Sequence, residues 1–176
     1  MPDDRELWRR ITEGDEQAFE DFYSQTALRL RAFLRQIVGS QEAAEDVAQE
    51  TYTKIWNRFN GDKPEAGQLR AYLYGAARRQ AVDWWRKQSS SRHVSGGDTV
   101  EEIAVASQAE KRSVVEDAFQ RLPAEQRALL WLREVEGQTY DELAVILDVP
   151  MGTVRSRLFA ARDALRKIWH GERRPV

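Results

Sequence analysis

Arginines are the side chains with the clearest chemical capacity in this chain, and they gather in two segments. Residues 61–92 carry 7 Lys and Arg against 3 Asp and Glu, and residues 148–176 carry the same numbers, although the formal net charge is −2. Guanidinium groups pair with phosphates, so two separated basic segments predict two surfaces for nucleic acid. Chance clustering of surface charge is the alternative that counting leaves open.

Groups that commonly carry enzymatic or metal chemistry are scarce. The chain has no Cys, which excludes disulfides and thiolate metal sites, and its only histidines are His93 and His170. We therefore expect no catalytic residue, no metal and no cofactor. A helical enzyme or adaptor unrelated to DNA remains a rival, but no His, Cys or paired-carboxylate constellation supports it. Salt-sensitive DNA binding would distinguish the two.

The second basic segment overlaps a predicted pair of helices at residues 139–165. Thr139 and Glu142 have the spacing of a capping box, and an apolar helical face follows them. Asp148 and Pro150 interrupt the pattern, and Pro suits the first turn of a new helix. The new helix has an apolar stripe formed by Val154, Leu158, Ala161, Leu165 and Ile168. Beside it lies a basic face formed by Arg155, Phe159, Arg162 and Arg166. Such a pair is typical of a DNA-binding helix-turn-helix, and a plain helical hairpin with a solvated face is the alternative.

The first basic segment includes a predicted helix at residues 68–87. Basic and aromatic residues are interleaved there. The basic residues are Arg70, Arg78, Arg79, Arg86 and Lys87, and the aromatic residues are Tyr72, Tyr74, Trp84 and Trp85. This mixture suits single-stranded nucleic acid, because cations meet phosphates while rings stack on unpaired bases. Burial in a core is the equally strong alternative for each ring.

The remaining pattern predicts an all-α chain of two small domains. Helices are expected at residues 4–12, 15–38 and 41–59, with caps at Asp15, Gly39 and Ser40. We place the first domain at residues 1–88, a flexible linker at 89–108 and the helix-turn-helix domain at 109–176. Within the last domain, a helix to Arg121 and a Pro-started helix at 123–136 precede the motif. No apolar run is long enough to cross a membrane and no signal peptide opens the chain, so we expect a cytoplasmic protein without membrane insertion.

Three segments resemble the bacterial extracytoplasmic-function (ECF) sigma factors. They are EAAEDVAQETYTKIW at residues 42–56, LRAYLYGAARRQAVDWWRK at 69–87, and residues 122–165. The resemblance covers nearly the whole chain and matches the minimal form with regions 2 and 4. It implies a subunit of bacterial RNA polymerase that directs promoter-specific transcription initiation without being an enzyme itself. It also implies two partners, core RNA polymerase and promoter DNA, and a third in an anti-sigma factor.

The resemblance also implies site residues. Asp46, Gln49 and Glu50 would dock on the clamp helices of the largest polymerase subunit. Recognition of the −10 element as an opened strand falls to Asn60, Gly61, Asp62, Lys63, Tyr72, Arg78, Arg79, Asp83 and Arg86. Recognition of the −35 element as duplex falls to Gly152, Thr153, Arg155, Ser156, Arg157, Phe159 and Arg162. The helix with Leu129, Trp131 and Leu132 would meet the polymerase flap, and a core role for these three is an equal alternative.

Three positions depart from the family pattern. Tyr72 stands where Trp is frequent, and Gly75 and Ala160 stand where a basic residue is frequent, which puts the strength of DNA contacts in question. The alternative function is a helix-turn-helix transcriptional regulator that does not melt DNA. That regulator needs only residues 139–165 and leaves residues 42–87 unexplained.

Overall fold

The computed structural model describes residues 4–59, 69–92 and 114–172, and within these ranges the regular elements are all helices. The elements are α1 (Asp4–Thr12), α2 (Glu16–Val38), α3 (Gln41–Phe59), α4 (Leu69–Arg92), α5 (Val114–Gln120), α6 (Ala124–Leu130), the π-helix η1 (Trp131–Val135), α7 (Tyr140–Leu147) and α8 (Met151–Glu172). The predicted all-α fold is confirmed. Below, α1–α4 are called the N-terminal half and α5–α8 the C-terminal half.

The ends of α2 and α3 are set by the capping residues that the sequence predicts. The Asp15 carboxylate accepts a hydrogen bond from the Ala18 amide at 3.0 Å, and the Ser40 hydroxyl accepts one from the Ala43 amide at 3.1 Å. Gly39 ends α2 at φ 81°, a left-handed conformation that glycine adopts without steric cost. Local chemistry therefore sets both ends of α2 and the start of α3.

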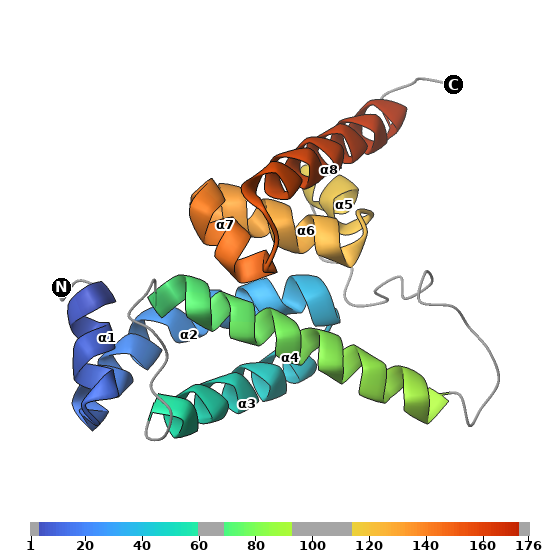
Figure 1. Ribbon diagram of the computed structural model, residues 1–176. Helices are drawn as coiled ribbons and strands as arrows, with labels where there is room; N and C mark the ends of the chain where they lie inside the picture. The colour runs from blue at the N-terminus through green and yellow to red at the C-terminus, as the bar shows by residue number, and fades with distance from the viewer. Residues whose placement is uncertain (1–3, 60–68, 93–113, 173–176) are drawn as a thin grey trace.

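Three long helices, α2, α3 and α4, pack together in the N-terminal half, and α1 closes one end (Figure 1). Their shared core contains fully buried side chains from all four helices, which include Leu7, Ile11, Phe22, Leu30, Phe33, Phe59, Leu69 and Leu73. Helix α4 runs to Arg92, past the predicted end at Lys87, and its last turns extend beyond this core (Figure 1). The predicted linker at 89–108 therefore begins inside a helix, and residues 93–108 of it lie outside the described residues.

The predicted helix at 123–136 is in fact two elements, α6 and the π-turned η1. The amide of Glu136 donates to the carbonyl oxygen of Trp131 at 3.1 Å, a bond across five residues. Gly137 follows at φ 71° and stops the helix, as predicted. The capping box of α7 is confirmed, because the Thr139 amide donates to Glu142 at 2.6 Å and the Glu142 amide donates to the Thr139 hydroxyl at 3.2 Å.

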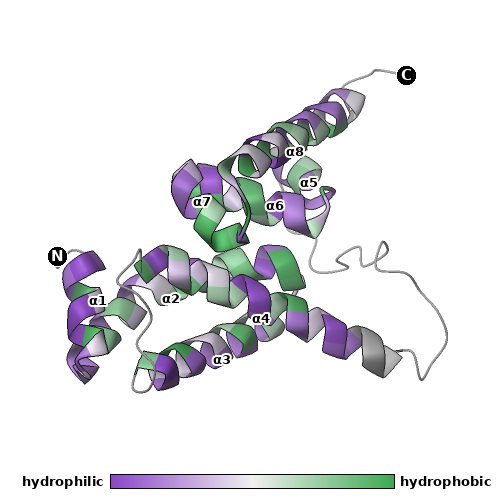
Figure 2. Cartoon of the chain, viewed as in Figure 1, coloured by the Kyte–Doolittle hydropathy of each residue, from purple (hydrophilic) through white to green (hydrophobic). Residues whose placement is uncertain are grey.

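The two halves pack against each other and share one hydrophobic core. Helix α6 lies on α2, α7 lies on α4, and α8 is the helix farthest from the N-terminal half (Figure 1). Figure 2 shows hydrophobic stretches of α7 and of the end of α2 where the halves meet. None of the helices in the described ranges has the length and apolar character needed to span a bilayer.

Candidate nucleic-acid interface

The turn between α7 and α8 presents the start of α8 to solvent. Asp148 adopts a left-handed φ of 54°, which Asp tolerates better than most residues, and its amide bonds back to the carbonyl oxygens of Ala144 and Val145. Pro150 directly precedes α8, and its carbonyl accepts the amides of Thr153 and Val154 at 2.9 and 3.2 Å. The predicted helix-turn-helix is thus formed, with its second helix starting at Met151.

The predicted −35 residues share the outer face of α8. Val154, Leu158 and Ala161 are buried on the inner face, which fixes the rotation of the helix. The outer residues are Gly152, Arg155, Ser156, Arg157, Phe159 and Arg162, all exposed, with Thr153 half-buried beside them. Phe159 is 72% exposed, an unusual position for a ring that would gain from burial. The face therefore offers cations and one apolar ring to a partner.

Two arginines of this face differ in how they are held. The Arg155 guanidinium lies 6.0 Å from the Tyr140 ring centroid and 3.5 Å from Sδ of Met151, both neutral groups. Arg162 instead donates to the Glu134 carboxylate at 2.7 Å. Hydrogen bonds to Glu134 and Tyr140 raise the pKa of Arg162. A phosphate must therefore compete with Glu134 for Arg162, whereas Arg155 meets no such competition from its neutral neighbours.

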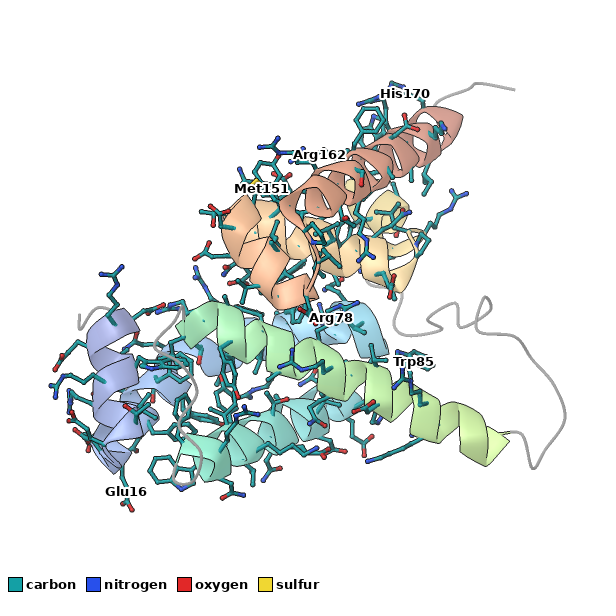
Figure 3. All side chains as sticks on the ribbon, in the orientation of Figure 1. Glu16, Arg78, Trp85, Met151, Arg162 and His170 are labelled. Atoms are coloured by element: carbon teal, nitrogen blue, oxygen red, sulfur yellow. The ribbon has the colours of Figure 1, made fainter. Side chains whose placement is uncertain are left out.

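Helix α4 carries the second group of predicted residues, and they differ in exposure. Arg79, Asp83 and Arg86 are exposed, and Arg86 pairs with Asp83 at 3.3 Å. The Arg78 side chain is only 23% exposed and reaches Glu125 of α6 at 3.7 Å. Figure 3 places Arg78 at the junction between the halves, far from Arg162 on the outer side. Asn60, Gly61, Asp62 and Lys63 lie outside the described residues.

The aromatic rings of α4 are largely committed to packing. Tyr72 is half-buried, with its ring centroid 5.9 Å from that of Trp8 and 6.0 Å from that of Phe59. The Trp85 indole donates to the carbonyl oxygen of Ile37 at 3.1 Å, and Tyr74 is 2% exposed. Burial and a hydrogen bond with Glu136 raise the pKa of Tyr74. Tyr74 is therefore a core residue, as the alternative predicts. The Tyr72 ring is packed on one side and keeps part of its surface exposed.

The acidic face of α3 is exposed as a unit. Asp46, Gln49 and Glu50 all lie on the solvent side of the helix, opposite buried Val47 and Ala48. Glu50 pairs with Lys54 at 2.8 Å, and the hydrogen bond from Lys54 lowers the pKa of the Glu50 carboxyl. The face therefore presents acidic side chains to solvent, and the charge of Glu50 is partly balanced by Lys54.

The three residues considered for the polymerase flap lie mainly inside the fold. Leu129 is 4% exposed and Leu132 is fully buried. Trp131 is half-buried, and its indole donates to Glu136 at 3.3 Å. The core alternative is therefore correct for the two leucines, and of the three residues Trp131 alone keeps surface for a flap contact.

Sequence reasoning missed a polar cluster at the junction of the halves. Arg127 of α6 is 8% exposed, and its guanidinium donates to the carbonyl oxygen of Gln36 at 3.0 and 3.2 Å. It also donates to the carbonyl oxygens of Gln120 and Leu122, each at 2.7 Å. Burial lowers the pKa of Arg127, yet a guanidinium stays charged at any ordinary pH. Backbone acceptors leave no mark in a sequence, so no pattern separates this arginine from a surface one.

Comparison with known families matches both halves. The model of Sigma-70 region 2 matches residues 22–91, and that of Sigma-70 region 4 matches residues 112–165. The first match contains the α3 face and all but the last residue of α4, and the second contains the helix-turn-helix. These are the two regions that the sequence predicts, in the predicted order. A regulator built on the helix-turn-helix alone is not favoured, because it would not account for the match to region 2.

Curated relatives match over nearly their full length. The RNA polymerase sigma-H factor of Pseudomonas aeruginosa is 29% identical, with 93% of this chain and 92% of that protein covered. The ECF RNA polymerase sigma-E factor of Escherichia coli K12 is 30% identical, with 92% of each chain covered. The chain therefore belongs to the ECF group of the sigma-70 family. It is a sigma factor that directs promoter-specific transcription initiation.

Two solved structures share the fold. A sigma factor RpoE of Bartonella quintana, solved with the anti-sigma factor NepR, is 26% identical at a TM-score of 0.68, with 88% of this chain and 99% of that chain covered. CnrH, solved with the cytosolic domain of CnrY, has a TM-score of 0.72 at 20% identity, with 96% of this chain and 97% of that chain covered. The second likeness supports the fold alone.

Proposed function

We propose that this sigma factor binds core RNA polymerase through the α3 face and reads a promoter with two separate surfaces. The outer face of α8 would read the −35 element as duplex, and α4 with residues 60–63 would hold the −10 element as an opened strand. One observation carries the proposal. A single chain presents two basic helices, α4 and α8, on separate surfaces, together with an acidic exposed face on α3.

Duplex reading by α8 follows from its side-chain chemistry. Arg155 can donate two hydrogen bonds to the edge of a guanine, and Phe159 can pack on a thymine methyl group. Gly152 is exposed at the start of this 22-residue helix, where backbone amides and the helix dipole favour a phosphate. Arg157, also exposed, suits the backbone, and Arg162 would exchange Glu134 for a phosphate.

Strand capture by α4 depends on exposed cations and on one ring. Arg79 and Arg86 are exposed and suited to phosphates, and the free edge of half-buried Tyr72 is suited to a base. Separating and extruding a base costs on the order of a few kcal/mol, so these contacts must be made together with those of residues 60–63. Asp83 pairs with Arg86 and would orient its guanidinium toward the strand.

Two protein partners follow from the charge of the surfaces and from the solved relatives. The exposed acidic face formed by Asp46, Gln49 and Glu50 is complementary to a basic helix, as we propose for the clamp of the largest polymerase subunit. Since a relative of 26% identity was solved with an anti-sigma factor, we also propose such a partner for this chain. The chemistry of RNA synthesis belongs to the polymerase, and we assign no catalytic residue to the sigma factor.

Run-off transcription tests the proposal. Purified chain would be added to bacterial core RNA polymerase with a library of promoter-length duplexes, and the transcripts would be sequenced. We expect transcripts from templates that share one −35 and one −10 sequence, and an Asp46→Ala, Gln49→Ala double variant to lose most of this output. Specific DNA binding without association with core polymerase would contradict the proposal and support the non-melting regulator.

A further inference from the structure

Met151 presents a thioether at the start of α8, directly beside the arginine that is proposed to read the −35 element. The residue is 37% exposed, and its Sδ atom lies 3.5 Å from a guanidinium nitrogen of Arg155, four residues further along the helix. Figure 3 shows Met151 on the outer side of the C-terminal half, where Arg162 also lies. We propose that Met151 is a site of reversible oxidation, at which conversion of the thioether to a sulfoxide withdraws Arg155 from DNA. The consequence for DNA binding rests on the proposed function of Arg155.

Sulfur is scarce in this chain, so an oxidant that attacks sulfur has few targets. The sequence has no Cys and only two methionines, Met1 and Met151. Of the residues that the structure describes, Met151 is therefore the one with a sulfur atom. Oxidation of a sulfur atom depends on its access to solvent, and the exposed position of Met151 provides that access.

Oxidation would transfer one oxygen atom from hydrogen peroxide to Sδ of Met151. A lone pair of the sulfur attacks one peroxide oxygen, an S–O bond forms and the O–O bond breaks. The second oxygen leaves with both protons as water, so the sulfur loses the two electrons that the peroxide gains. A methionine sulfoxide reductase reverses the change with two thiols as reductant, which become a disulfide while the oxygen leaves as water. The modification is therefore reversible.

The unmodified thioether is a weak competitor for Arg155. A thioether sulfur is a weak hydrogen-bond acceptor, and the other neighbour of the guanidinium is the neutral Tyr140 ring, with its centroid 6.0 Å away. The edge of a guanine offers two stronger acceptors to the same guanidinium. Arg155 can therefore exchange its contact with Met151 for a contact with a base.

A sulfoxide would be a strong competitor at the same place. Its oxygen carries a partial negative charge and would be one S–O bond from Sδ, within hydrogen-bond reach of the guanidinium nitrogen that contacts the sulfur. A hydrogen bond from a guanidinium is charge-assisted, and the positive end of the α8 dipole also favours this oxygen at Met151, the first residue of the helix. Oxidation would thus give Arg155 a competing acceptor of the kind that Arg162 already has in Glu134 at 2.7 Å.

Duplex titration before and after oxidation tests the inference in the full chain. The chain would be treated with hydrogen peroxide until mass spectrometry of its peptides shows one added oxygen on Met151. We expect Kd for the −35 duplex selected by run-off transcription to rise about tenfold, the order of effect of losing an arginine contact to a base edge. Kd for a scrambled duplex should change little, and a methionine sulfoxide reductase should restore the first value. An unchanged Kd for the selected duplex after oxidation of Met151 would overturn the inference, as would a Met151 that stays reduced while Met1 is oxidised.

Met151→Leu is the matched control, because leucine is apolar and of similar size but forms no sulfoxide. Each variant is compared with its own untreated sample, so the effect of the substitution itself cancels. We expect no response of Met151→Leu to peroxide, and a response equal to that of the parent chain would overturn the inference. Circular dichroism must show unchanged helicity after oxidation. If helicity falls, Met151→Gln decides, since it places a polar acceptor at this position without an oxidant, and a Kd equal to that of Met151→Leu overturns the inference.

Arg155→Ala separates the sulfoxide contact from the proposed function. Oxidation of Met151 in this variant should leave Kd unchanged, because the cation that the sulfoxide would bind is absent. A further loss of affinity would overturn the role of Arg155 in the inference. In the parent chain without DNA, the NMR signals of the Arg155 side-chain N–H groups should shift on oxidation.

The two measurements together show which proposal fails. A shift of the Arg155 signals, with selected-duplex binding unaffected both by oxidation and by Arg155→Ala, would support the sulfoxide contact and contradict the proposed function of Arg155. Weaker binding by Arg155→Ala, with neither the signals nor the binding of the parent chain changed by oxidation, would overturn the inference and leave the proposed function intact.

Discussion

Helices α4 and α8 are both long and basic, yet the fold treats them differently. Helix α8 buries one narrow stripe and leaves its outer face free, whereas α4 is packed against α1, α2, α3 and α7. Its aromatic residues are correspondingly held by other rings and by backbone carbonyls. A basic helix in a sequence is therefore not by itself an available surface. The surface that a basic helix can offer to DNA depends on how many other helices pack against it.

The strongest contrast within α8 is between neighbouring Leu158 and Phe159. Leu158 is 1% exposed, so Leu158→Ala should lower the free energy of unfolding by about 2–5 kcal/mol. Phe159→Ala, at a 72% exposed position, should leave stability almost unchanged and weaken binding to the cognate −35 duplex. Chemical denaturation and duplex titration measure the two effects. A large stability loss for Phe159→Ala would show that the outer face of α8 is misassigned.

Arg155 tests whether α8 reads bases. Arg155→Ala should cost about 1–3 kcal/mol of binding on the correct −35 duplex if its guanidinium meets a base edge. Binding to a scrambled duplex at the same salt concentration should change little, and Arg157→Ala, at a second exposed arginine, serves as the phosphate-contact comparison. Equal weakening of Arg155→Ala on both duplexes would assign Arg155 to the DNA backbone.

Tyr72 tests whether α4 still has a ring to offer to a base. Tyr72→Ala should spare duplex binding and reduce permanganate reactivity of −10 thymines in the polymerase complex, because loss of base stacking costs about 1–3 kcal/mol. Tyr72→Phe keeps the ring and its packing on Trp8 and Phe59, so it should behave as the parent protein does. Unchanged reactivity for Tyr72→Ala would restrict this ring to the core.

Glu134 should have the smallest effect, and in the opposite direction. Glu134→Gln removes the carboxylate that holds Arg162 at 2.7 Å and so frees a cation for DNA. Duplex affinity should rise by about threefold, and the slope of log affinity against log salt should steepen by about 0.9 for one added phosphate contact. Arg162→Gln should abolish the gain in the double variant. A steeper slope that survives Arg162→Gln would point to another cation.

Local features of the fold could be predicted from the sequence. The helices α1 to α3, the caps at Asp15 and Ser40, and the capping box at Thr139 are set by residues close together in the chain. The helix-turn-helix and the solvent side of α3 followed from hydrophobic spacing. The predicted helix at residues 68–87 begins within one residue of α4 but ends too early, because Ser89–Ser91 have the composition of a linker while the helix continues to Arg92.

Features that depend on contacts between distant segments could not be predicted. The π-turn in η1 and the buried position of Arg127 depend on backbone acceptors, which no side-chain pattern encodes. From the sequence, Gly75 is only a missing basic residue, because its packing against Ile146 joins positions that are 71 residues apart in the chain. For the same reason, the aromatics of α4 could be read as stacking residues or core residues with equal justification.

Site-specific crosslinking in the assembled promoter complex would test the division of labour between the two helices most directly. A photoreactive amino acid would replace Arg79 on α4 or Arg157 on α8, both exposed, in the full chain bound to core RNA polymerase and a promoter selected by run-off transcription. We predict that the Arg79 position crosslinks to the −10 region of one opened strand, and the Arg157 position to the −35 duplex. Crosslinks from both positions to duplex DNA, or from the Arg79 position to protein alone, would contradict this account.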